Sequence, residues 1–189
     1  MTPLALQGGF ADAPLQSARA FRAALTALAE PASLHQVEGA EPPAPMSVAA
    51  GVLLLVLADA TTPVHLAGAL DCAACRDWVT FHCGAPLAAA EAAQFAVGIW
   101  QALLPVDRFA QGLPDYPDRS CTLIIEMPEL SAKGARLRGP GIKGEARLSL
   151  PEVAAFQANR GLYPLGFDAF LTAGSRLAGL PRSTHVEDV

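Results

Sequence analysis

Two patterns of apolar positions alternate along this chain, and together they predict a fold that mixes helices with strands. Helical spacing in residues 14–29 is carried by five apolar side chains, which are Leu15, Ala18, Phe21, Leu25 and Leu28. Asp12 can cap the start of this helix, and Pro31 ends it. Further helices are expected over residues 47–59, 71–82 and 152–157.

Short apolar runs bounded by Gly or Pro lie between these helices and predict strands. In the first half of the chain they cover residues 33–37, 63–67 and 94–97. Residues 105–119 are rich in Pro, Asp and Gly and are expected to form a loop. The strands predicted after this loop are 121–127, 135–138, 145–150, 167–173 and 176–180. The interleaved elements predict an α/β fold, a single layered domain over residues 1–189 with a mixed β-sheet flanked by helices.

The composition predicts that part of the apolar surface stays exposed after the chain folds. Charged residues make up 16% of the chain and apolar residues 52%, and the mean hydropathy is +0.32. This balance favours an oligomer or a subunit of a complex. The longest apolar run, Met46 to Ala58, is shorter than the roughly 18 to 20 residues of a membrane-spanning helix, so a buried core helix is expected instead.

The net charge and the absence of a targeting pattern in the first residues exclude further classes of protein. A net charge of −5 argues against general nucleic-acid binding, which needs clustered cations. The first cationic residue is Arg19, so we expect neither a secretory signal nor a transit peptide, and we expect a cytoplasmic protein. Reduced thiols are expected there for Cys72, Cys75, Cys83 and Cys121.

One short stretch of the chain is basic. Residues 133–147 contain Lys133, Arg136, Arg138, Lys143 and Arg147 with Glu145 as the only acid, a local charge of +4. The predicted strands in it alternate leucines with arginines, so a hairpin would have one apolar and one basic face. Glycines in the turn 139–142 could leave N–H groups free to bind a phosphate or an acidic partner beside the arginines. The alternative is an ordinary solvated hairpin.

The spacing of the cysteines resembles that of a metal or redox site, but the pattern is incomplete for both. Cys72 and Cys75 stand one helical turn apart, with His82 and Cys83 seven residues on. A structural zinc site needs four ligands, and only three are available here unless Cys121 or His65 folds in. A redox pair would need a strand leading directly into the helix, which the pattern lacks. Buried apolar thiols are therefore the interpretation that the pattern favours.

The histidines do not form a known catalytic template. No Gly-x-Ser-x-Gly turn, His-Glu-x-x-His helix or phosphate-binding glycine loop occurs. His35 and His65 fall within predicted strands, where a structural role is expected. His185 and Arg182 could present a pair to an anion, although an irregular clamp held by backbone hydrogen bonds is the stronger interpretation of this tail.

Ordered short motifs give the chain a family resemblance. They are Phe21-Arg22 to Glu30-Pro31, Phe81-His82, residues 117–122 (PDRSCT), residues 137–142 (LRGPGI), residues 161–168 (GLYPLGFD) and residues 180–187 (LPRSTHVE). In this order they resemble the H subunit of the carbon–phosphorus lyase system, which breaks down phosphonates.

That resemblance implies a homodimer within a core complex with G-, I- and J-type subunits. The family system converts alkylphosphonate and ATP to ribose 1-phosphonate 5-triphosphate, and the H subunit is not known to do this unaided. The resemblance also implies a fold similar to that of pyridoxal-phosphate-dependent transferases, without the cofactor. Only Lys133 and Lys143 could form the Schiff base, and neither has the expected burial, so we expect no cofactor and no metal.

Two classes of function thus remain open. The first is an accessory subunit of phosphonate catabolism, with Arg136, Arg138, Lys143, Arg147, Arg182 and His185 as candidate anion- or partner-binding residues and no catalytic residue assigned. The second is an autonomous protein, either a transferase that uses Arg182 and His185 or a thiol or zinc protein that uses Cys72 and Cys75.

Overall fold

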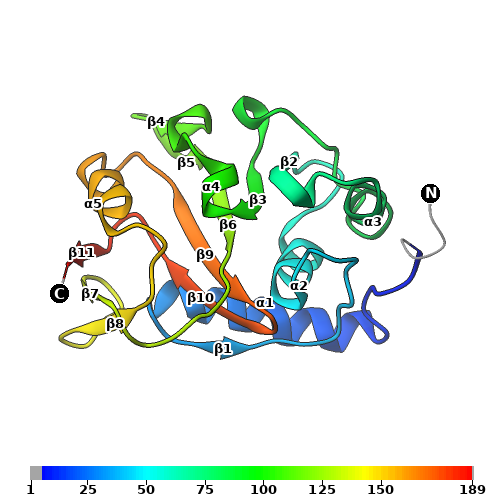
Figure 1. Cartoon of the computed structure of the whole chain (residues 1–189), viewed down its shortest axis with the longest axis horizontal. Helices are drawn as coiled ribbons and strands as arrows, with labels where there is room; N and C mark the ends of the chain where they lie inside the picture. Colours follow the sequence, from blue (N-terminus) through cyan, green and yellow to red (C-terminus); the bar gives the residue numbers. More distant parts are fainter. Residues whose placement is uncertain (1–5, 189) are drawn as a thin grey trace.

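A computed structural model, which describes residues 6–188, contains a central sheet of six strands in the order β1-β10-β9-β6-β3-β2 (Figure 1). Their bounds are β1 His35–Gln36, β2 Val64–Leu66, β3 Phe95–Ile99, β6 Thr122–Glu126, β9 Asp168–Ala173 and β10 Arg176–Leu180. The four strands β2, β3, β6 and β9 are parallel, whereas β10 is antiparallel to β9 and β1 is antiparallel to β10. The predicted mixed sheet flanked by helices is confirmed.

The remaining elements cover the sheet and extend it at one end. The helices are α1 Ala13–Ala29, α2 Val48–Leu57, α3 Ala73–Cys83, α4 Trp100–Leu103 and α5 Val153–Gly161. A small sheet has the strand order β11-β7-β8, with bounds His185–Glu187, Ala135–Arg138 and Ala146–Leu148, and a two-stranded ribbon pairs β4 Gln111–Leu113 with β5 Tyr116–Ser120. Figure 1 shows α2 and α3 towards one end of the molecule and α5 with the small sheet towards the other.

Alternation along the central strands divides the core into two layers. In β6, Ile124 packs with residues of α1, α2 and α3, whereas its neighbours Leu123 and Ile125 pack with the aromatic rings of the opposite face. Phe170 of β9 joins the same helical layer as Ile124. Both faces of the central strands are therefore buried, as expected for parallel strands with uninterrupted apolar sequences.

Helix α1 lies unusually close to strand β10 because small residues face each other. The buried side chains of α1 are Ala20, Ala24 and Ala27. At Gly179 of β10, a Cβ atom would stand 2.5 Å from the backbone carbonyl carbon and oxygen of Ala27. The absence of a side chain at Gly179 thus sets the separation between the helix and the sheet.

The larger apolar residues of α1 point away from this contact. The helix and its Asp12 cap are confirmed, but Leu15, Phe21 and Leu25 are 58%, 49% and 59% exposed. The spacing that predicts the helix therefore belongs mostly to its outer face, and the alanines form the inner one. Apolar surface does remain uncovered on the chain, as its composition predicts.

Several boundaries differ from the prediction. Residues 105–119 are not a loop, because a turn at Pro114 and Asp115 joins β4 to β5. Helix α4 was not anticipated, α5 continues to Gly161, and the tail contains strand β11 rather than an irregular clamp. Among residues 6–188 no helix combines the length and apolar character that crossing a membrane requires.

We predict that Gly179→Ala lowers the free energy of unfolding by about 1 to 3 kcal/mol, because the added methyl group would overlap the backbone of α1. Urea denaturation checks this. The matched control is Gly161→Ala in α5, where an added Cβ meets no atom within 4 Å, so its midpoint should stay level or rise. Equal midpoints for the two variants would contradict the close approach.

Candidate functional site

A cleft opens at the carboxyl edge of the parallel strands β2, β3 and β6, where ligands bind in many open α/β sheets. Its volume is about 660 Å³. The lining residues come from six regions of the chain and are Pro45, Ser47, Ala69, Leu70, Ile99, Trp100, Gln101, Glu126, Met127, Pro128, Pro151 and Gly174. We refer to it as the carboxyl-edge cleft.

Glu126 is the last residue of β6, and within residues 6–188 it is the one charged group in the wall of this cleft. Its carboxylate accepts the backbone N–H of Ser47 at 2.7 Å and the hydroxyl of Thr172 at 3.0 Å. Ser47 is the N-cap of α2, and its own hydroxyl accepts the N–H of Ala50 at 3.1 Å. The carboxylate thus lies at the positive end of the α2 dipole and joins α2 to β6 and β9.

The lining favours neutral or cationic groups over phosphates. Among the residues that the structure describes, no Lys, Arg or His lines the carboxyl-edge cleft, and most of its lining residues are apolar. A phosphate or phosphonate bound there would meet the Glu126 carboxylate without a cation to offset the repulsion. Trp100 is fixed in the wall because its indole N–H donates to Glu152 at 2.8 Å.

The basic stretch predicted from the sequence forms one face of the β11-β7-β8 sheet. Register places Arg136 opposite Arg147 on β8 and opposite Glu187 on β11, and it places Arg138 opposite His185. Ala135, Leu137 and Leu148 are buried on the other face, so the predicted alternation is confirmed. We call the surface of Arg136, Arg138, Arg147 and His185 the basic face.

Acidic residues neutralise part of the basic face. Arg136 forms an ion pair with Glu187, and Arg138 pairs with Glu145 at 3.2 Å. Arg147 and Lys143 are exposed and have no acidic partner within residues 6–188. The ring of His185 lies 3.2 Å from the Arg160 guanidinium. The face therefore keeps a surplus of positive charge in an acidic chain.

The glycine turn between β7 and β8 packs against the end of α1. An added Cβ at Gly141 would stand 2.0 Å from the carbonyl oxygen of Ala29 and 2.8 Å from the Pro31 ring. An anion beside Gly141 would therefore meet a carbonyl oxygen at the negative end of a helix. An anion or acidic partner would be better placed on the arginine side chains than in this turn.

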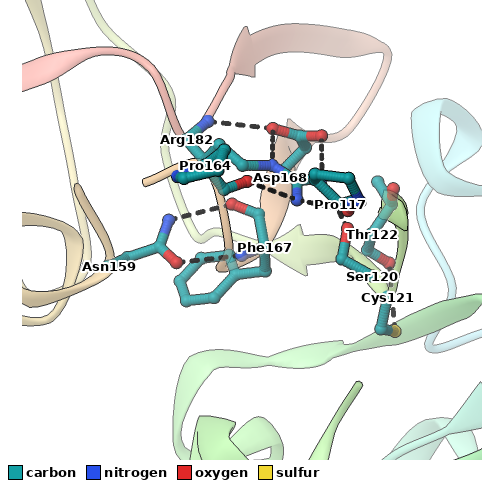
Figure 2. A network of polar contacts seen from close by, with 9 residues as sticks. All are labelled: Pro117, Ser120, Cys121, Thr122, Asn159, Pro164, Phe167, Asp168 and Arg182. Atoms are coloured by element: carbon teal, nitrogen blue, oxygen red, sulfur yellow. Dashed lines mark hydrogen bonds and ion pairs between the residues drawn. The ribbon is translucent and has the colours of Figure 1, made fainter. Parts of the chain in front are cut away.

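Arg182 is separate from the basic face and holds the amino edge of the sheet together (Figure 2). Its guanidinium donates to both oxygens of Asp168, at 3.1 and 2.6 Å, to the Ser120 hydroxyl at 2.5 Å and to the Pro117 carbonyl at 2.8 Å. The side chain is only 11% exposed. With its donors already engaged, Arg182 has little capacity for an added ligand, and His185 contacts Arg160 instead.

Beside this network, Asn159 of α5 grips the chain just before β9 (Figure 2). Its side-chain amide accepts the Phe167 N–H and donates to the Phe167 carbonyl, both at 2.9 Å. Both polar ends of this buried amide are satisfied, and the entry into β9 is fixed.

The cysteines do not gather into a metal site. Cys72 and Cys75 lie together at the start of α3, whereas His82 and Cys83 lie at its end. The His82 ring contacts the Gln7 carbonyl at 3.0 Å, and the His65 ring contacts the Ala88 carbonyl at 3.0 Å. In the part of the chain that the structure describes, no three His, Cys, Asp or Glu residues are placed to hold a metal ion.

Comparison with known proteins gives the family. Residues 8–187 match the model of the family described as bacterial phosphonate metabolism protein (PhnH). The chain belongs to the PhnH family. A PhnH relative from Rhizobium meliloti (strain 1021) is 37% identical over 189 residues, covering 95% of this chain and 94% of the relative. That relative is named α-D-ribose 1-methylphosphonate 5-triphosphate synthase subunit PhnH.

Sequence reasoning located the basic face but missed the carboxyl-edge cleft. The signal for Glu126 was present, because an acidic residue directly follows the buried strand residues 123–125. Its significance depends on β6 lying parallel between β3 and β9, and that order cannot be read from local patterns.

We predict that Arg182→Lys lowers the free energy of unfolding by about 1.5 to 3 kcal/mol, because a lysine cannot reproduce the guanidinium bonds to three partners. Chemical denaturation of the purified chain measures the change. Arg176→Lys, at an exposed position, is the matched control and should leave the midpoint unaltered. The assignment would be wrong if both variants unfolded like the parent chain.

Proposed function

We propose that this PhnH-family chain is a subunit of the complex that makes α-D-ribose 1-methylphosphonate 5-triphosphate during bacterial phosphonate catabolism. The observation that carries the proposal is the Rhizobium meliloti subunit of that synthase, which is 37% identical over nearly the full length of both chains. Such similarity along the whole chain favours a shared place in a shared assembly. Other subunits of the synthase are then the natural partners.

The proposed role is accessory, with the chain supporting conversion of alkylphosphonate and ATP by partner subunits of the G, I and J types. The basic face supplies the contact for an acidic partner surface or for a phosphate or phosphonate group. On this face Arg136 stands opposite Arg147, and Arg138 stands opposite His185. The carboxyl-edge cleft, with Glu126 as its charged group, suits a part of the substrate or partner that carries no negative charge.

A cofactor-free relative of the pyridoxal-phosphate transferase fold is also part of the proposal. Pyridoxal phosphate would need a lysine beside a closed pocket to form its Schiff base. Lys133 and Lys143 are both exposed, one before β7 and one in the turn after it, and neither lines the carboxyl-edge cleft. This placement supports a role without the cofactor.

A homodimer in the cytoplasm completes the proposal. Exposed apolar side chains on the outer face of α1 support it, because Leu15, Phe21 and Leu25 are each about half exposed or more.

The competing idea of an autonomous transferase using Arg182 and His185 is weakened by the bonds that already occupy Arg182.

Reconstitution tests the function. The partner subunits of the synthase are combined with ATP and methylphosphonate in the presence and absence of this chain, and the triphosphate product is followed by phosphorus NMR. We expect the product signal to require the chain. Equal product formation in its absence would overturn the proposal.

The basic face is tested by Arg136→Ala/Arg138→Ala. If these arginines contact a partner subunit or ATP, the double variant should bind at least about tenfold more weakly, since charge-assisted bonds buried on binding contribute about 1.5 to 3 kcal/mol each. Calorimetry measures the affinity of the double variant for the partner subunits and for ATP. Its melting temperature should change little, because the ion pairs of Arg136 with Glu187 and of Arg138 with Glu145 are exposed. Arg176→Ala is the control; unchanged binding by the double variant would favour a solvated hairpin.

The oligomeric state has its own test. Light scattering of the purified chain at micromolar concentration and moderate salt should give the mass of two chains of 19.6 kDa each. A mass of one chain under these conditions would contradict the homodimer.

A further inference from the structure

The start of α3 brings two cysteines together outside the surfaces discussed above. Strand β2 leads through a short 3-10 turn, Gly68–Leu70, to Cys72, which is the N-cap of α3. Cys75 follows one helical turn later. The strand predicted before this helix is thus present, and the short 3-10 turn joins the two instead of a direct connection. Side chains three residues apart on a helix lie about 5 to 6 Å from each other, a spacing compatible with a disulfide after slight closure.

The two thiols differ in access. Cys72 is half-buried and can be reached by a small molecule, whereas Cys75 is completely buried. The Cys75 thiol donates to the Pro43 carbonyl at 3.5 Å, and one helical turn separates Cys75 from Cys72. The arrangement provides one accessible sulfur with a second, enclosed sulfur behind it.

The pKa values of the two thiols also differ, with the more accessible Cys72 having the lower one. The Cys75 backbone N–H, followed by the Cys75 thiol and the Ala74 N–H, stabilises the thiolate of Cys72 and lowers its pKa. Burial first, and then the neighbouring Cys72 sulfur, raise the pKa of Cys75 to about 12. Once Cys72 is covalently capped its charge is removed, and one cause of the high Cys75 pKa disappears with it.

From this geometry we propose that Cys72 and Cys75 form a thiol–disulfide redox pair, in which Cys72 attacks and Cys75 resolves. The Cys72 thiolate attacks a low-molecular-weight disulfide such as oxidised glutathione, forms a mixed disulfide and releases one half as a thiol. Cys75 then attacks the Cys72 sulfur, and the second half leaves as a thiol. Two electrons and two protons pass from the protein to the glutathione disulfide, and the protein gains one internal disulfide.

The other cysteines lack this arrangement. Cys83 is at the far end of α3 and Cys121 is in the opposite core layer, and burial raises the pKa of each to about 12. They therefore provide internal controls. The redox pair does not depend on the proposed place in the synthase, so either proposal can fail without the other.

Oxidation of the purified chain tests the pair. The folded protein is incubated with reduced and oxidised glutathione at neutral pH, quenched by alkylation and weighed by mass spectrometry. We expect the parent chain and Cys83→Ser/Cys121→Ser to lose two alkylatable thiols and two hydrogen atoms. Cys75→Ser should instead retain one glutathione on Cys72. Cys72→Ser should form neither the internal disulfide nor a mixed disulfide with glutathione. A parent chain that keeps all four thiols, or stops at the mixed disulfide, would overturn the proposal.

A second measurement does not depend on these variants folding well. Iodoacetamide alkylation of the reduced parent chain should label Cys72 more than about tenfold faster than the other three cysteines at neutral pH, because only this sulfur is both accessible and stabilised as thiolate. Its rate should rise with pH through a midpoint below the ordinary cysteine value of about 8.5. Uniform labelling, or a midpoint above that value, would contradict the assignment.

Discussion

The contact between α1 and strand β10 sets the geometry of much of the molecule. Because Gly179 has no side chain, the Ala27 backbone reaches the strand directly, and the inner face of α1 can hold only small residues such as Ala20 and Ala24. The same helix ends under the turn of the small sheet, where Gly141 meets Ala29. One close approach therefore fixes α1 on the central sheet, leaves its larger apolar residues outside, and supports the hairpin that carries the basic face.

The carboxyl edge of the sheet brings together two chemically distinct features. Glu126 joins the start of α2 to β6 and β9, and the segment just before α2 supplies the Pro43 carbonyl that accepts the Cys75 thiol. The cleft wall and the cysteine pair thus share residues 43–47 as a neighbour. The amino edge has a contrasting role, because the charge network around Arg182 and Asp168 holds strands and loops together there.

Local patterns in the sequence were enough to predict most strands and helices, since turn residues and apolar periodicity act over short distances. They also predicted the two-faced hairpin of Arg136 and Arg138. They did not predict which face of α1 is buried, because Leu15 and Leu25 look like core residues until Gly179 is placed opposite the alanines. Likewise β11 forms only by pairing with β7, far away in the chain, and Glu126 is significant only through its parallel neighbours.

The central sheet contains a long detour between two adjacent parallel strands. The chain leaves β6 at Glu126, builds β7, β8 and α5, and comes back at Asp168 to pair with β6. Closing so long a loop costs chain entropy before any contact between β6 and β9 is gained. The consequence is kinetic: the middle of the sheet is assembled from distant segments, so its folding rate should be governed by the search that brings these two strands together rather than by the helices at its flanks.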